Sequence, residues 1–109
     1  MIGKITKGTS FKGCISYVLG KQDARLLEVE GVLAEGIPAV VAGFQAQRMM
    51  NPDIRQPVGH ISLSYAPEDA HKLTDEMMVL LAKEYMERMG IKDTQYIIAR
   101  HHDQKHPHV

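Results

Sequence analysis

The alternation of side chains between residues 58 and 65 is the feature that most restricts how this chain can fold. One parity of positions is apolar or small, and it comprises Gly59, Ile61, Leu63 and Tyr65. The other parity is mostly polar, and it comprises Val58, His60, Ser62 and Ser64. Because successive side chains of a strand point to opposite faces, this pattern predicts a β-strand with one apolar and one polar face. A polar row of this kind either faces solvent or lines a site, and the pattern alone favours solvent.

The remaining sequence alternates between strand and helix patterns. We expect further strands near residues 1–7, 25–33 and 95–100, of which the second is either a strand or a loose hairpin. We expect helices near residues 9–20, 37–50 and 74–90. Typical boundary residues support the helices, namely Thr9 or Ser10 and Thr74 as amino-terminal caps, Pro38 in a first turn, and Gly20 and Gly90 as stops.

Helical spacing also predicts which side chains each helix buries. The predicted sets are Phe11, Cys14, Ile15 and Val18 in the first helix, Val40, Val41, Phe44 and Met49 in the second, and Leu73, Met77, Leu80, Leu81, Tyr85 and Met89 in the third. Tyr17 lies off the apolar stripe of the first helix, near its carboxyl end. Its hydroxyl is therefore expected to face out of the core, as it also would in an ordinary tyrosine at the rim of a core.

Length and composition indicate one small domain over residues 1–109, because 109 residues with 44% hydrophobic content can bury a single core. The one cysteine, Cys14, excludes a disulfide framework and fits a reducing cytosol. There is no signal-peptide pattern and no apolar run long enough to span a bilayer. We therefore expect a cytoplasmic protein with no membrane partner.

Charge is balanced over the whole chain, with 13 basic and 13 acidic residues, so net charge does not mark a nucleic-acid-binding protein. The amino-terminal segment is locally basic, since Lys4, Lys7, Lys12 and Lys21 all precede the first acid, Asp23. This block could face a phosphate backbone, and an ordinary solvated surface explains it at least as well.

The last nine residues gather four of the six histidines around one acid, Asp103. Imidazole is the commonest protein ligand for metals, and a strand–turn–strand hairpin would bring His101 and His108 together, with Asp103 orienting one ring. Two imidazoles do not close a metal site, so a third ligand must come from elsewhere or from beyond Val109. The strand through His108 is expected to leave neighbouring strands with an open edge. The chain should then either fray after about Arg100 or associate with another copy through this edge. The alternative is a solvated polar tail or an expression tag.

Three segments together resemble the motifs of one family. The segment KGTSFKGCISYVL at residues 7–19 is similar to the first motif of mobilization relaxases, the tyrosine nucleases that nick plasmid and transposon DNA for conjugative transfer. GHISLSY at residues 59–65 resembles the second motif, and HHDQKHPHV at residues 101–109 resembles the third, H-x-D-x-x-x-P-H-x-H. The resemblance is closest to mobilization proteins of Bacteroides-type elements. It implies an α+β fold, an antiparallel sheet with flanking helices of the HUH relaxase type, and an amino-terminal part of the nuclease domain that ends inside the histidine motif.

The resemblance also implies roles for individual residues. Tyr17 corresponds to the nucleophile that attacks the scissile phosphodiester and becomes a 5′-phosphotyrosine. His101 and His108 correspond to ligands of one Mg²⁺ or Mn²⁺ ion, with a third histidine expected at position 110, and Asp103 would orient a ring or assist the tyrosine proton. The expected DNA contacts are Ser64, His60, Lys7 and Lys12. The partners so implied are single-stranded DNA at an origin of transfer and relaxosome accessory proteins, in the bacterial cytoplasm.

Two other functions remain open at the level of sequence. A rolling-circle replication initiator or transposase uses the same tyrosine and histidine cluster, although Tyr17 precedes the histidines here and usually follows them in those initiators. The second alternative is a catalytically empty DNA-binding or assembly module.

Overall fold

The computed structural model describes residues 1–50, 52–91, 94–102 and 106–109. The elements in chain order are β1 (Ile2–Gly8), α1 (Phe11–Leu19), β2 (Arg25–Glu30), α2 (Ile37–Met49), β3 (Val58–Ser64), the short 3₁₀ helix η1 (Pro67–Lys72), α3 (Asp75–Arg88) and β4 (Tyr96–Arg100). The predicted strands and helices are all present, and residues 25–30 form a strand rather than a hairpin. No described helix combines the length and the apolar character that crossing a membrane requires.

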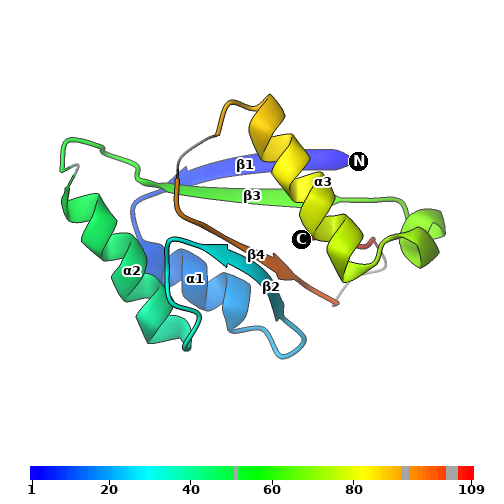
Figure 1. Cartoon of the computed structure of the whole chain (residues 1–109), viewed down its shortest axis with the longest axis horizontal. Helices are drawn as coiled ribbons and strands as arrows, with labels where there is room; N and C mark the ends of the chain where they lie inside the picture. The colour runs from blue at the N-terminus through cyan, green and yellow to red at the C-terminus, as the bar shows by residue number, and fades with distance from the viewer. Residues whose placement is uncertain (51, 92–93, 103–105) are drawn as a thin grey trace.

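The strands form two antiparallel pairs, β1 with β3 and β2 with β4. In the first pair Ile5 lies opposite Ile61, and in the second a register shift interrupts the ladder between Leu26 and Glu28. β3 and β4 occupy the middle of the molecule, with α3 on one side of them and α1 and α2 on the other (Figure 1). The predicted α+β class with an antiparallel arrangement and flanking helices is confirmed.

A short carboxyl-terminal segment, Pro107–Val109, joins the two pairs at one end. The Leu63 N–H donates to the Val109 carbonyl and the Val109 N–H donates to the Leu63 carbonyl, both at 3.0 Å. On the other side the His101 N–H donates to the His108 carbonyl at 3.3 Å. The segment therefore lies between β3 and β4, and the expectation that the chain frays after Arg100 is wrong for these residues.

Each face of the strand layer carries its own apolar cluster. The cluster under α1 and α2 is built on Ile15, Val40 and Val41, with Leu19, Val32, Ile37, Phe44 and Ile97 packed against it. The cluster under α3 is built on Leu63, Ala82 and Ile98, with Leu27, Ile61, Tyr65, Val79, Tyr85, Met86, Tyr96 and Val109 around it. The apolar parity of β3 thus faces α3, as the alternation predicts, and the polar parity faces α1.

Side-chain caps define the amino termini of two helices. The Ser10 hydroxyl accepts a hydrogen bond from the Gly13 N–H at 2.9 Å, so Ser10 rather than Thr9 begins α1. The Thr74 hydroxyl accepts from the Met77 N–H at 3.2 Å, as expected for α3. A cap of this kind satisfies one of the donors that have no partner inside the helix, which fixes where each helix starts.

The predicted buried sets of α2 and α3 are wrong at several methionine and leucine positions. Met49 is 79% exposed, and in α3 the exposed fractions are 40% for Met77, 60% for Leu80 and 52% for Met89. The buried face of α3 instead centres on Met78 and Ala82, one turn apart. The sequence places apolar residues side by side at Met77–Met78 and Leu80–Leu81, so periodicity alone does not decide which of each pair faces the sheet.

Candidate functional site

His101 and His108 come together at the end of β4. Their backbones form an antiparallel bridge, and their ring centroids lie 5.3 Å apart with the planes at 74°. They are the buried polar residues of the described chain, at 9% and 7% exposure. The predicted convergence of these two rings is confirmed. Asp103 lies outside the described residues, and its expected role stays a prediction.

Hydrogen bonds to backbone carbonyls orient both rings. His101 Nε2 lies 2.7 Å from the Val18 carbonyl, and His108 Nδ1 lies 3.1 Å from the His106 carbonyl. A carbonyl oxygen only accepts, so these two nitrogens carry the protons that they donate. In the neutral rings the lone pairs therefore belong to Nδ1 of His101 and Nε2 of His108. This is how metal-binding histidines are commonly held, with one nitrogen fixed by a carbonyl and the other able to act as a ligand.

Tyr17 lies on the turn of α1 that His101 contacts, because Val18 is its neighbour in the chain. The Tyr17 side chain is 57% exposed, as predicted. The His60 ring packs edge-on against the Tyr17 ring at a centroid distance of 5.8 Å, and the Lys21 ammonium lies 4.7 Å from the centre of the Tyr17 ring. Tyr17 is thus accessible, with its ring in contact with the His60 and Lys21 side chains.

The environment of His60 favours its neutral form. Burial lowers the pKa of the His60 imidazole, and electrostatic interaction with the nearby His101 and Lys21 side chains lowers it further. These effects favour the neutral form of His60, in which one ring nitrogen can donate a hydrogen bond and the other can accept one.

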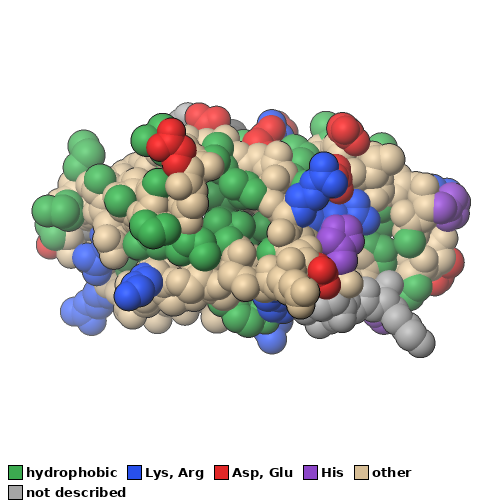
Figure 2. Space-filling view, turned by 90° about the horizontal axis from the view of Figure 1, so that it is seen from below, with side chains coloured by type: hydrophobic (Ala, Val, Ile, Leu, Met, Phe, Trp, Pro, Cys, Tyr) green, Lys and Arg blue, Asp and Glu red, His purple; other side chains and the backbone are tan. Residues whose placement is uncertain are grey.

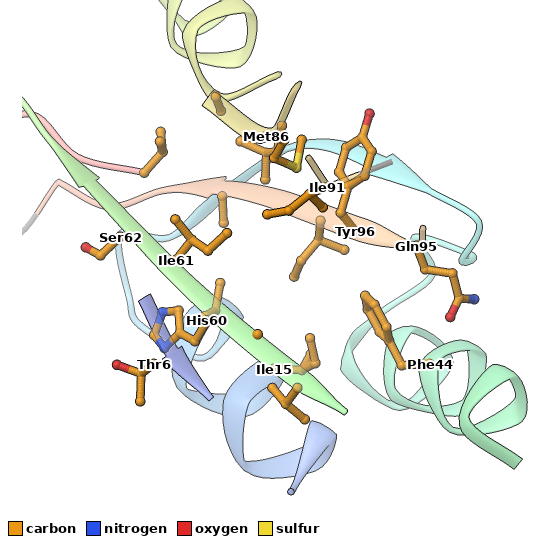
Figure 3. A pocket seen from close by; sticks show the side chains of 18 of the residues that line it. Thr6, Ile15, Phe44, His60, Ile61, Ser62, Met86, Ile91, Gln95 and Tyr96 are labelled. Atoms are coloured by element: carbon orange, nitrogen blue, oxygen red, sulfur yellow. The ribbon is translucent and has the colours of Figure 1, made fainter. Parts of the chain in front are cut away.

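A cavity of about 700 Å³ connects these side chains. Its lining includes Tyr17, His60, Ser64, His101 and His108. His60, Ser62 and Ser64 are all half-buried, so the solvent-facing interpretation that the β3 pattern alone favours is wrong. Their parity faces α1, and Ser64 forms a backbone bridge with His108. Figure 3 shows His60 and Ser62 on β3, at the wall of this cavity.

The structure separates the basic residues into two groups. Cross-strand partners share a face, and Lys7 pairs with Gly59, whose parity faces α3 rather than α1. Lys7 and Lys12 are exposed and are not part of the cavity lining, whereas Lys4 pairs with Ser62 and lines the cavity together with Lys21. The β1–β3 register is the signal that separates Lys4 from Lys7, and the sequence does not contain it.

The candidate metal ligands among the described residues are two imidazoles, those of His101 and His108. Among them no group of three or more histidine, cysteine, aspartate or glutamate side chains is arranged to hold an ion. Two buried, converged imidazoles with carbonyl-oriented rings fit two positions of a divalent-metal coordination sphere. The two imidazoles could therefore ligate a metal, and the described residues do not complete its coordination sphere.

Comparison with known proteins identifies the family. The model of the MobA/VirD2-like relaxase nuclease domain matches residues 17–109, from Tyr17 through both buried histidines. The chain belongs to the MobA/VirD2-like relaxases. No curated protein and no solved structure matches it. The resemblance to the relaxase family is confirmed, and with it the general activity of a DNA-nicking nuclease family; the matched region contains the second and third motifs and only the end of the first.

Proposed function

We propose that this relaxase chain nicks and rejoins one DNA strand at an origin of transfer, with Tyr17 as the nucleophile. The observation that carries the proposal is the placement of an exposed tyrosine on the helical turn that bonds to His101, one member of a buried histidine pair. The family match, which extends from that tyrosine across the histidines, supports it. It also favours a relaxase over a replication initiator or transposase.

The proposed reaction is a transesterification. The Tyr17 oxygen loses its proton and forms a bond to the scissile phosphorus, while the bond from phosphorus to the 3′ oxygen breaks and that oxygen takes up a proton. The product is a 5′-phosphotyrosine and a free 3′-hydroxyl. Because one phosphate ester replaces another, the 3′-hydroxyl can attack the phosphotyrosine in the reverse step and rejoin the strand. Asp103 is proposed to assist in orienting a histidine ring or moving the tyrosine proton.

His101 and His108 would hold a Mg²⁺ or Mn²⁺ ion next to the scissile phosphate. A divalent ion, when bound, polarises the non-bridging phosphate oxygens and offsets the charge that develops in the transition state. Imidazole ligands suit a polyanionic substrate, because neutral rings leave the full charge of the ion for the phosphate, whereas carboxylates would cancel it. The hydrogen bonds that the two rings donate to the carbonyls of Val18 and His106 keep them in the orientation for this task.

The proposed DNA contacts fall into two sets, one near the nick and one farther along the strand. Ser64 and His60 line the cavity and would contact the strand near the nick, and Lys4 and Lys21 add positive charge on the same side. Lys7 and Lys12, on exposed positions away from the cavity, would contact more distant phosphates. On the face seen in Figure 2, basic side chains are scattered between hydrophobic ones. Accessory proteins that open the origin, in a bacterial cytoplasm, complete the proposed setting.

A covalent-complex assay tests the proposal. The chain is mixed with single-stranded oligonucleotides from a candidate origin and Mn²⁺, and the products are separated on a denaturing gel. A protein band shifted by DNA is expected for the native sequence and for Tyr96→Phe, and it should be absent for Tyr17→Phe, which keeps the ring and removes the nucleophilic oxygen. A shifted band that persists in Tyr17→Phe would exclude Tyr17 as the nucleophile. Loss of the band in both variants would point to a general defect instead.

A further inference from the structure

Arg100 ends β4 on the face of the strand layer that α3 covers. Ile98 and Tyr96, earlier in the same strand, belong to the apolar cluster under α3, and strand alternation places Arg100 on their face. The Arg100 side chain is only 13% exposed. Its Nη1 donates to the Leu73 carbonyl at 2.8 Å and to Asp75 Oδ1 at 3.1 Å. The guanidinium therefore fastens the end of β4 to the residues where α3 begins (Figure 1).

Asp75 lies between two arginines of neighbouring strands. Arg100 pairs with Arg25 of β2 in the antiparallel ladder, so the two side chains lie opposite each other on one face. Like charges in this position destabilise the pair. The Asp75 carboxylate divides its oxygens between them, with Oδ1 at 3.1 Å from Arg100 Nη1 and Oδ2 at 3.3 Å from Arg25 Nη1. The carboxylate thus offsets a repulsion that would otherwise loosen this end of the β2–β4 ladder.

The position of Asp75 in its helix also favours a carboxylate. Thr74 caps α3, and Asp75 is the first helical residue. The backbone N–H groups at a helix start give it a partial positive charge, which stabilises an acid there. Arg25 is 69% exposed, so its ion pair is largely solvated, whereas the side chains of Arg100 and Asp75 are 13% and 29% exposed. The contact between Asp75 and Arg100 is therefore the stronger half of the bridge.

The residue that follows Arg100 is His101, whose side chain points to the opposite face of the layer. Its Nε2 donates to the Val18 carbonyl at 2.7 Å, on the turn of α1 that carries Tyr17. The end of β4 is thus held on one face by α3 through Arg100 and on the other by α1 through His101. Strand ends open locally when few contacts hold them. Loss of the hold on the α3 face should therefore loosen the His101 ring on the other face.

We propose that Asp75 is a positioning residue for His101. Through Arg100 it holds the end of β4 in place, so that the His101 ring keeps its hydrogen bond to Val18. Asp75 begins α3, across the strand layer from the histidine pair, so it acts through Arg100 and not on the reacting phosphate. The expected effect on catalysis rests on the proposed function, whereas the orientation of the His101 ring can be measured without DNA.

Nuclear magnetic resonance of the histidine side chains tests this role in the chain alone. The Nε2–H proton of His101 is protected from exchange with water while its hydrogen bond to Val18 is intact. Asp75→Asn keeps the size of the side chain and removes its charge, and it should make this exchange at least about tenfold faster. Asp75→Ala, which also removes the acceptor, should have an effect at least as large. Unchanged exchange in both variants would overturn the inference.

Glu28→Gln is the matched control, because Glu28 makes a similar link at the other end of β4. Its Oε2 lies 2.7 Å from Lys83 Nζ of α3 and accepts from the Tyr96 hydroxyl of β4 at 3.1 Å. Asp75→Asn and Glu28→Gln should both lower the Tm by about 1–5 °C. Glu28→Gln should change the exchange of the His101 proton less than about twofold. Equal acceleration by the two substitutions would assign Asp75 to general stability and overturn the inference.

The covalent-complex assay separates this inference from the proposed function. With DNA affinity unchanged, Asp75→Asn should form the Tyr17 adduct about 10–100-fold more slowly in Mn²⁺, the range typical of losing a group that orients a metal-binding histidine. Glu28→Gln should react at the native rate. A native rate in Asp75→Asn would contradict the inference alone. No adduct from the native chain would contradict the proposed function, and the exchange of the His101 proton would then decide the inference by itself.

Discussion

His101 has two structural tasks at the level of the single residue. Its Nε2 bonds to the carbonyl of Val18 at 2.7 Å, which ties the buried histidine pair to the helical turn of Tyr17. Its Nδ1 carries the lone pair that a metal would use. The sequence predicts that His101 and His108 converge, because a hairpin brings the ends of the motif together. It does not predict the link to Val18, since a contact between residues 83 positions apart depends on the tertiary fold.

The link to Val18 leads to a prediction for stability. His101→Ala should lower the free energy of unfolding by about 1–3 kcal/mol, because it leaves the partly buried Val18 carbonyl without its donor. His102→Ala is the matched control, since His102 is exposed and should change stability by less than about 0.5 kcal/mol. Urea unfolding followed by circular dichroism measures both. Equal stability of the two variants would contradict the structural role of the His101 ring.

At the scale of the element, helix α3 shows where sequence patterns are sufficient and where they fail. Its boundaries are predictable, because the Thr74 cap and Gly90 are local signals. Gly90 adopts a φ of +74°, which glycine tolerates and which ends the helix region. The rotation of α3 about its axis is not predictable, because Met77 and Met78 have the same residue type and the sheet decides which of them is buried.

Substitution of the two neighbouring methionines tests the orientation of α3. Met78 is fully buried, so Met78→Ala should cost about 2–5 kcal/mol of stability through lost burial and the remaining cavity. Met77→Ala is chemically the same change at a site that is 40% exposed, and it should cost less than about 1 kcal/mol. Thermal unfolding of the two variants provides the comparison. A larger loss for Met77→Ala would mean that α3 is rotated relative to the described arrangement.

At the scale of the whole molecule, the three-residue segment Pro107–Val109 adds a backbone link between two strand pairs that also share the apolar cluster under α3. The alternation in residues 58–65 predicts a strand with one core face, and the motifs imply an antiparallel α+β fold; both are confirmed. The sequence does not predict that Pro107–Val109 bridges β3 and β4, because this bridge depends on pairing across more than forty residues.

Removal of residues 107–109 should therefore affect the entire fold. The deletion takes away the paired hydrogen bonds between Leu63 and Val109, the bond from Tyr65, and the buried His108 side chain. We expect a loss of at least about 2 kcal/mol in the free energy of unfolding. Removal of Met1, which is 66% exposed and lies outside β1, is the control and should have little effect. Unchanged stability after the first deletion would show that the two strand pairs hold together without this segment.

The central claim is that Tyr17, beside the histidine pair, forms the covalent bond to DNA. The most direct measurement is mass spectrometry of the protein–oligonucleotide adduct after digestion with trypsin and nuclease. The account predicts that the peptide from Gly13 to Lys21 carries a nucleotide joined through its 5′-phosphate, and that fragmentation places this nucleotide on Tyr17. An adduct on Tyr65, Tyr85 or Tyr96, or an adduct on the same peptide that fragmentation places on Ser16, would contradict the account.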